Sequence, residues 1–209
     1  MEKIGSVSSA FDMEVVIVDD ASTDMTPQVL KNMPGVLVLR HGSNEGKGAA
    51  ILTGLERATG KVVVIQDADL EYDPKEIPHL VSPIFEGKSL VVYGSRFKGK
   101  IEGMKFSHYV GNKILSFFTS LLYGVRITDL MTGYKAFRTD VFRKLDLKSS
   151  RFEFELEVTV NALEKGYRID EVPIAYSIRK FGKAKIGWTD GVKCLFHLFV
   201  RRLRYHRKD

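Results

Sequence analysis

Short apolar runs alternate with longer amphipathic segments through the first half of the chain. The runs are rich in valine, isoleucine and leucine and have the length of buried strands: Glu14–Val18, Val36–Leu39, Lys61–Ile65 and Ser89–Tyr93. The segments between them have apolar positions at helical spacing: Thr26–Met33, Gly46–Ala58 and Pro74–Phe85. Apolar strands that alternate with helices predict an α/β fold, a mostly parallel sheet with helices on both faces.

The second half is less regular, and its pattern favours helices. The expected elements are helices at Val110–Tyr123 and Phe152–Lys165 and a strand at Arg168–Ile178, with a polar segment at Thr128–Arg138. The end of the chain, Thr189–Arg207, has apolar residues at helical spacing and a cluster of arginines. We therefore expect one globular domain over residues 1–191 and a basic amphipathic helix over residues 192–209.

Composition indicates a folded protein with an anionic partner. The 209 residues suit one domain, and 44% hydrophobic with 28% charged residues is typical of a globular chain. The net charge of +6 fits a nucleotide, a phosphate, a nucleic acid or an anionic lipid and does not choose among them. The single cysteine, Cys194, excludes an internal disulfide and fits a reducing, cytoplasmic location. No stretch stays apolar over the ~20 residues that span a bilayer, so no membrane-crossing helix is expected.

An Asp-x-Asp motif, Asp67-Ala68-Asp69, directly follows the strand expected at 61–65. In parallel sheets, ligands bind beyond the carboxyl ends of the strands. Two carboxylates in that place can direct oxygen ligands at one divalent cation, and Glu71 can add a third. Mg²⁺ or Mn²⁺ suits such ligands when substrate phosphates complete its shell. Acidic pairs are also common in turns, and the position at a strand end is what favours a metal.

A second acidic pair, Asp19-Asp20, ends the first expected strand. Carboxylates there can bind a ribose or a base edge, whereas Thr23 or Asp24 can cap the next helix. The run Asn44-Glu45-Gly46-Lys47-Gly48 then opens a helix with the glycines that a phosphate-binding turn needs. It lacks the spacing of a P-loop and is equally consistent with a simple tight turn.

Several cations are candidates for binding phosphate: Arg96, Lys135, Arg138, Arg179, Lys183 and Lys185. Most surface cations are merely solvated, so each alone is a weak signal. Arg179 and Lys185 are favoured because Gly182, between them, allows a turn that brings both toward one anion.

Taken together, these segments resemble the family 2 glycosyltransferases of the GT-A fold, above all the polyprenyl-phosphate hexosyltransferases (dolichyl-phosphate mannose and dolichyl-phosphate glucose synthases). The matching runs are VVIVDDASTD at 15–24, NEGKGAAILTGLERATG at 44–60, VVVIQDADLEYDP at 62–74, YGSRF at 93–97, TDLMTGYKAFR at 128–138, FEFELEV at 152–158 and EVPIAYSIRKFGKAKIGWTDG at 171–191. They cover nearly all of residues 14–191, and their number and order make coincidence a poor explanation.

The resemblance implies a GT-A (Rossmann-like) catalytic domain and an inverting transfer of a hexose from GDP-mannose or UDP-glucose to a polyprenyl or dolichyl phosphate. The implied donor-binding residues are Asp19, Asp20, Lys47, Asp67 and Arg96, and the implied metal ligands for Mg²⁺ or Mn²⁺ are Asp67, Asp69 and Glu71. The implied acceptor-binding residues are Arg96, Lys135, Arg179 and Lys185, and the implied catalytic residues are Asp69, Asp129, Arg179 and Lys185.

The residue types suit this reaction. A divalent cation neutralises the charge that builds up on the departing nucleoside diphosphate. A lipid phosphate is already anionic near pH 7, so it needs cations that bring two anions together rather than a strong base. The alternative acceptor, a polysaccharide or glycolipid hydroxyl, would need a base, for which Asp129, Glu153 and Glu155 are candidates.

Two departures from the family pattern stand out. The family begins with an apolar strand and a turn that holds the nucleotide base, whereas this chain begins MEKIGSVSSAFDM. We therefore expect an N-terminally truncated sheet in which two strands lack a partner. Near residues 105–113, where the family often has an arginine for the acceptor phosphate, the chain offers Lys105, His108 and Lys113.

A lipid acceptor predicts peripheral contact with the cytoplasmic face of a membrane. The candidates for this contact are the apolar segment Ile114–Val125 and the basic C-terminal helix, although the same residues suit a core and a solvated surface. Two remote alternatives are a phospho-receiver domain, with Asp67 as the modified residue, and a nucleic-acid-binding protein. The first would leave the motifs at 128–191 unexplained, and the second lacks aromatic residues spaced among the cations.

Overall fold

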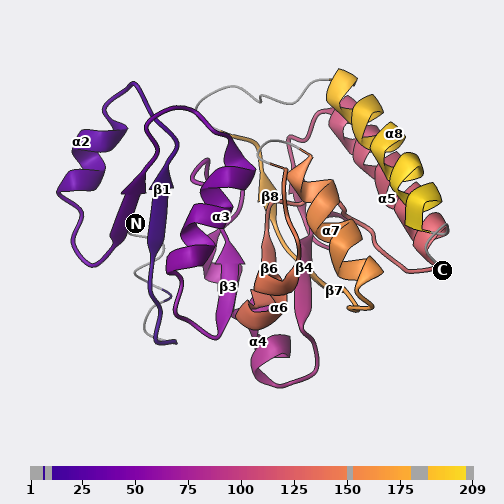
Figure 1. The fold of residues 1–209 in the computed structure, drawn as a ribbon, viewed down its shortest axis with the longest axis horizontal. Coiled ribbons are helices and arrows are strands. Elements are labelled where there is room, and N and C mark those ends of the chain that lie inside the picture. Colours follow the sequence, from indigo (N-terminus) through magenta and orange to yellow (C-terminus); the bar gives the residue numbers. More distant parts are fainter. Residues whose placement is uncertain (1–6, 8–10, 150–152, 180–187, 206–209) are drawn as a thin grey trace.

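The computed structural model describes residues 7, 11–149, 153–179 and 188–205. The strands are β1 (Val16–Asp19), β2 (Leu37–Arg40), β3 (Val62–Ile65), β4 (Val91–Ser95), β5 (Ile101–Glu102), β6 (Lys135–Arg138), β7 (Asp170–Pro173) and β8 (Tyr176–Ser177). The α-helices are α2 (Thr26–Lys31), α3 (Lys47–Arg57), α4 (Ile77–Phe85), α5 (Phe106–Tyr123), α6 (Thr139–Lys144), α7 (Phe154–Glu164) and α8 (Trp188–Tyr205). The molecule extends from β1, β2 and α2 at one end to the paired helices α5 and α8 at the other (Figure 1).

A four-stranded sheet in the order β3-β6-β4-β7 forms the centre. β4 and β7 are parallel, whereas β6 runs antiparallel between β3 and β4. The segment Thr128–Arg138, which looks only polar in the sequence, thus contains a central strand. Its apolar part is only Ala136-Phe137, flanked by Lys135 and Arg138, and this is too short for hydrophobic periodicity to reveal it.

The strand expected at Arg168–Ile178 is in fact two strands in two sheets. β7 joins the central sheet, and β8 pairs with β5. The ladder to β4 ends after Ile174, whose N–H donates to the carbonyl oxygen of Ser95 at 3.1 Å. The N–H of Ala175 donates to Glu76 and that of Tyr176 to the carbonyl oxygen of Lys100, so the chain has left the central sheet.

β1 and β2 form a separate parallel pair. Within the described residues, β1 pairs only with β2, and β3 only with β6. Helix α3 packs on β1, with Gly54 facing Val16 and Val18 of the strand.

Helices cover both faces of the central sheet, as the sequence predicts. Alternate residues of a strand point to opposite faces. Val92 and Ala136 pack against α4 on one face. Val91, Tyr93 and Phe137 pack on the other face in the core shared with α3, α6, α7 and the pair α5 and α8. This second core is the larger, and the rings of Phe137 and Phe142 stack in it with centroids 4.3 Å apart.

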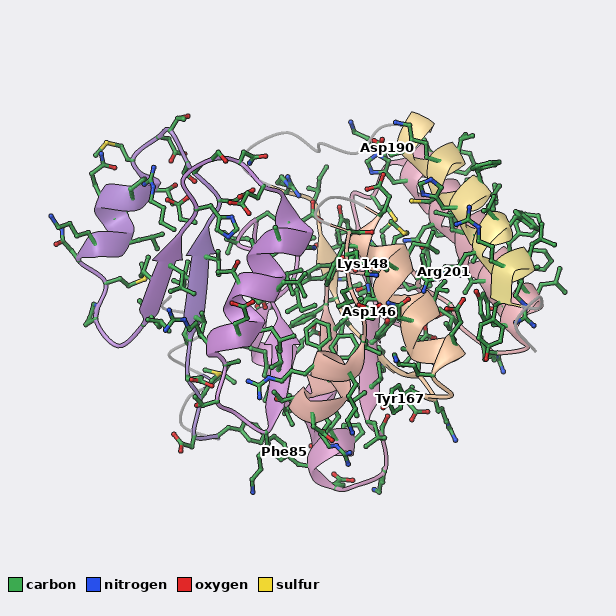
Figure 2. The ribbon with its side chains drawn as sticks, viewed as in Figure 1. Phe85, Asp146, Lys148, Tyr167, Asp190 and Arg201 are labelled. Carbon is green, nitrogen blue, oxygen red and sulfur yellow. The ribbon has the colours of Figure 1, made fainter. Side chains whose placement is uncertain are left out.

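Helix α8 lies against α5 and α7 at the end of the molecule. Arg201 reaches from α8 to α7 and donates to Glu164 at 3.0 Å (Figure 2). The outer sides of α5 and α8 expose large apolar side chains: Phe106, Tyr109, Ile114, Phe117, Leu121, Val192, Phe196, Phe199 and Leu203. None of the helices in the described ranges combines the length and the apolar character needed to cross a bilayer.

Gly99 lies so close to the chain after β7 that a side chain should not fit. An added Cβ would stand 2.1 Å from the carbonyl oxygen of Ile174. We expect Gly99→Ala to lower the free energy of unfolding by about 1–3 kcal/mol, since overpacking of this kind forces the backbone apart. Gly111→Ala is the matched control because Gly111 lies in α5 with open space around it. It should raise the free energy of unfolding by roughly 0.5–1 kcal/mol through helix propensity.

Urea denaturation of both variants measures this difference. Similar changes in Gly99→Ala and Gly111→Ala would contradict the close approach of the two segments.

Candidate active site

Polar side chains from three strands of the central sheet meet at one of its edges. β3 and β4 end there, and β6 begins there because it runs the other way. Lys135, the first residue of β6, is opposite Ile65 of β3 and Tyr93 of β4. This arrangement brings together three parts of the chain: the acidic loop after β3 (residues 67–71), Arg96 after β4, and the polar segment before β6.

Four ionisable side chains form a chain of alternating charge at this edge. Lys47 Nζ lies 2.7 Å from Asp67 Oδ2 and 2.9 Å from Glu155 Oε1. Glu155 accepts a hydrogen bond from Lys135 Nζ, which also donates to the carbonyl oxygens of Leu130 and Thr132. The side chain of Lys135 is 0% exposed and that of Glu155 is 6% exposed, so each charge depends on its neighbours.

Burial and pairing act in opposite directions on these groups. Burial opposes ionisation of Glu155, but the ammonium groups of Lys135 and Lys47 outweigh it and its pKa is lowered. Burial opposes the charge of Lys47 too, and Glu155 and Asp67 outweigh it, so its pKa is raised. Asp67 and Lys135 are the outer members of this line of four charges, and each has only one ionic partner within it. Burial prevails for both, so the pKa of Asp67 is raised and that of Lys135 is lowered. The two central groups, each between opposite charges, therefore hold their charges most firmly.

Arg179 joins the other two acidic residues of the loop. Its Nη2 lies 2.5 Å from Asp69 Oδ2, and its Nε lies 3.2 Å from Glu71 Oε1. Leu70, between the two acidic residues, has a φ of 62°, a left-handed conformation that is uncommon for leucine. Strained backbone of this kind is concentrated at functional sites.

The carboxylates of the acidic loop are ligands of the type that a divalent cation prefers, and Lys47 and Arg179 lie against them in the structure. In the described part of the chain, no group of three or more His, Cys, Asp or Glu side chains is arranged to hold a metal ion. Mg²⁺, however, is commonly held by one or two carboxylates together with substrate phosphates. Asp67 and Asp69 satisfy that requirement, and the pairing with Lys47 and Arg179 shows that the loop attracts positive charge.

The acidic pair after β1 holds loops in place. Asp20 accepts from the backbone N–H groups of Glu45 and Gly46 at 2.8 Å each and lies 2.8 Å from Nδ1 of His41. It therefore fixes the turn that leads into α3. Asp19 accepts from the backbone N–H of Ser22 at 2.9 Å and pairs with Arg40 at 3.1 Å. The sequence predicts that Asp19 and Asp20 contact a nucleoside. In the structure, both carboxylates accept hydrogen bonds from backbone N–H groups of nearby loops.

Asp24 accepts from the backbone N–H of Thr26 at 2.9 Å, at the start of α2. The N-cap of α2 is Met25, and no side chain makes a capping hydrogen bond there, so Asp24 supports the start of the helix from the residue before the cap.

Arg96 and Asp129 form a buried pair beside β4. Arg96 donates from Nε and Nη2 to the two carboxylate oxygens at 2.8 and 2.7 Å, and its backbone N–H donates at 2.9 Å. Asn112 adds a fourth hydrogen bond to Asp129 at 2.9 Å. Asp129 is 0% exposed. This burial indicates that Asp129 positions Arg96 and does not itself contact a substrate. The sequence, in contrast, predicts a catalytic role for Asp129.

Lys135 also differs from expectation. The sequence suggests that it binds an acceptor phosphate, but its ammonium group is fully buried and bonded to Glu155 and two carbonyl oxygens. Arg138, at the other end of β6, pairs with Asp140. Lys183 and Lys185 lie outside the described residues.

The sequence gives another role for Glu155 than the structure does, and it gives none for Gly133. The sequence suggests Glu155 only as a base for a hydroxyl acceptor, and the structure places it between two ammonium groups. Gly133 packs directly on the Asp67–Lys47 pair, because a Cβ there would stand 2.5 Å from Asp67 Oδ2 and 3.1 Å from Lys47 Nζ. Both lie in matching runs of the sequence, at 152–158 and 128–138, and only those runs could have indicated them.

Comparison with known proteins identifies relatives over most of the chain. The family model described as Glycosyl transferase family 2 matches residues 4–146. An uncharacterised protein of Methanocaldococcus jannaschii is 34% identical over 198 residues, which are 90% of this chain and 81% of that protein. The polyprenol monophosphomannose synthase of Mycolicibacterium smegmatis is 30% identical over 197 residues, 88% of this chain and 74% of that protein.

A longer relative is the low-salt glycan biosynthesis hexosyltransferase Agl6 of Haloferax volcanii, 33% identical over 201 residues. The match covers 93% of this chain but only 48% of that protein, so this chain spans about half its length.

Among solved structures, the fold resembles glucosyl-3-phosphoglycerate synthase from Mycobacterium tuberculosis. The crystal structure of that enzyme in complex with Mn²⁺, uridine-diphosphate and phosphoglyceric acid matches with a TM-score of 0.72 at 18% identity. The match covers 96% of this chain and 71% of that chain. At this identity the likeness shows a shared fold.

The buried pair of Arg96 and Asp129 makes a testable contribution to stability. We expect Asp129→Ala to lower the free energy of unfolding by about 3–5 kcal/mol, because it leaves a buried guanidinium without its counter-charge. The control is Asp140→Ala, which removes the partner of Arg138 at an exposed site and should change stability little. Guanidinium chloride denaturation measures both variants, and a small change in Asp129→Ala would show that the pair does not support the fold.

Proposed function

Because the chain belongs to glycosyl transferase family 2, we propose that it transfers a hexose from a nucleotide sugar to a polyprenyl phosphate. The protein is a glycosyltransferase with the GT-A fold. The similarity to a polyprenol monophosphomannose synthase, at 30% identity over 88% of this chain, supports the lipid phosphate as acceptor. GDP-mannose and UDP-glucose are the proposed donors, and experiment decides between them.

One observation carries the proposal: an acidic loop and a set of internal cations meet at the end of β3. We assign Asp67 and Asp69, with Glu71 beside them, to an Mg²⁺ or Mn²⁺ ion. The bound ion would neutralise the charge that builds up on the leaving nucleoside diphosphate. The Mn²⁺ and uridine-diphosphate in the structure of the M. tuberculosis synthase, a protein of the same fold, support this assignment.

The chain's own cations organise the two anions. In the proposed reaction, an oxygen of the acceptor phosphate forms a bond to the anomeric carbon while the bond to the nucleoside diphosphate breaks, with inversion. Arg96, fixed by Asp129, supplies a preorganised positive charge near the transferred sugar. Arg179 and Lys185 are assigned to the donor and acceptor phosphates, and Lys47 to the donor side. Asp19 and Asp20 act on the nucleoside through the loops that they hold.

The state of Asp129 and Glu155, two of the three candidate bases, favours a phosphate acceptor over a sugar hydroxyl. A hydroxyl needs a general base with a free oxygen near the reacting atoms. Asp129 accepts hydrogen bonds from Arg96 and Asn112, and Glu155 is paired with Lys47 and Lys135. A phosphate needs no such base because it is already anionic.

We propose that α5 and α8 rest on the cytoplasmic face of a membrane, where a lipid acceptor resides. Their exposed apolar side chains include Phe117, Leu121, Phe196 and Leu203, each more than 60% exposed. Lys193, Arg202 and Arg204 lie on α8 among them, and a basic amphipathic surface of this kind binds anionic headgroups. In this proposal the membrane contact is made by the exposed side of α8, whose inner side buries Cys194 and Leu198 in the main core.

The membrane proposal predicts a defined binding defect. Phe196→Ser/Leu203→Ser should lower affinity for vesicles of anionic phospholipid by at least about tenfold, because two large apolar side chains no longer enter the bilayer. Met25→Ser/Val29→Ser is the matched control, since both residues are similarly exposed near and in α2, at the other end of the molecule. Co-sedimentation with vesicles gives the affinities, and equal binding by the two double variants would contradict the proposed surface.

The activity proposal is tested by a panel of donors. GDP-mannose, UDP-glucose and UDP-N-acetylglucosamine are each incubated with a short polyprenyl phosphate and Mn²⁺, and the product is scored as a new lipid-linked sugar. We expect one donor to be used, and we expect Asp69→Ala to abolish the transfer while the melting temperature stays near that of wild type. Removal of Mn²⁺ and Mg²⁺ with EDTA should have the same effect. Transfer by Asp69→Ala at the wild-type rate would exclude the metal role of this residue.

A further inference from the structure

Lys47 stands between two carboxylates that differ in exposure. Its Nζ lies 2.7 Å from Asp67 and 2.9 Å from Glu155. The side chain of Asp67 is 28% exposed, whereas that of Glu155 is 6% exposed. Asp67 is therefore the partner that a ligand from solvent can reach, and Glu155 is the partner that stays inside the protein.

This arrangement creates a conflict for any cation that binds Asp67. Two positive charges a few ångströms apart repel each other, and the repulsion is stronger in a partly buried site than in water. Lys47 must then either compete for the carboxylate or keep its charge paired elsewhere.

We propose that Glu155 is a positioning residue that retains Lys47 when a divalent cation takes Asp67. Glu155 offers Lys47 a second anionic partner, so that the ammonium group remains paired after Asp67 turns to the metal. Lys135 fixes Glu155 for this task through a fully buried hydrogen bond. The inference rests on the proposed function, because it takes Asp67 as a ligand of the ion.

The test is a double-mutant cycle that measures Mn²⁺ affinity by the electron paramagnetic resonance of free Mn²⁺, with GDP or UDP present. Glu155→Gln should weaken Mn²⁺ binding roughly tenfold, because Lys47 then keeps Asp67 as its one anionic partner. In a Lys47→Met background, the same Glu155→Gln substitution should change Mn²⁺ affinity less than about twofold. A purely structural role of Glu155 would not depend on Lys47 in this way.

Two further variants protect the test against misfolding. Glu164→Gln is the matched control, since it removes a partner of Arg201 from the last turn of the same helix α7 and should keep the wild-type Mn²⁺ affinity. If Glu155→Gln alone does not fold, Glu155→Gln/Lys135→Met removes both members of the buried pair and replaces it in the cycle. Melting temperatures are recorded for every variant.

The outcomes separate this inference from the proposed function. Equal losses of Mn²⁺ affinity from Glu155→Gln in the wild-type and Lys47→Met backgrounds, or no loss in either, would overturn the inference and leave the proposed sugar transfer standing. A wild-type protein that transfers no sugar and binds no Mn²⁺ with either nucleotide would overturn both.

Discussion

The buried ion pair between Lys135 and Glu155 is the interaction on which the site depends. Lys135 opens β6, and Glu155 lies in the first turn of α7, so the pair joins the central sheet to the helix that covers it. Each charge would be costly to bury alone, and together they carry a line of alternating charge outward through Lys47 to Asp67. The geometry of the acidic loop is thereby tied to the core of the domain.

The antiparallel strand β6 makes this connection possible. In a purely parallel sheet, the carboxyl ends of β3 and β4 would collect only the loops that follow them. β6 inserts between these two strands in the opposite direction, and its first residue meets the same edge. The polar segment before β6, which holds Asp129 and Gly133, is thus delivered to the site from a later part of the chain. Arg96 and Asp129, 33 residues apart, pair there.

Local pattern predicted much of this architecture because short apolar strands and amphipathic helices depend mainly on neighbouring residues. The strands at Glu14–Val18 and Lys61–Ile65 and the helix at Gly46–Ala58 were expected within a few residues of β1, β3 and α3. The family motifs also placed the acidic loop and Arg179 in one site, and their ion pairs show that they meet. β6 was missed, because a strand with a buried lysine at its start has no apolar signature until the partner of that lysine is known.

By itself, the sequence determined the α/β class, the family, and the residue types that suit sugar transfer, since each of these depends on runs of adjacent residues. Only the tertiary structure decided which charged side chains face a ligand and which face one another. Lys135, Asp129 and Glu155 are all plausible ligand contacts in the sequence, and folding buries each of them against an opposite charge or a hydrogen-bond donor. Such pairing joins residues far apart in the chain, so no local pattern can reveal it.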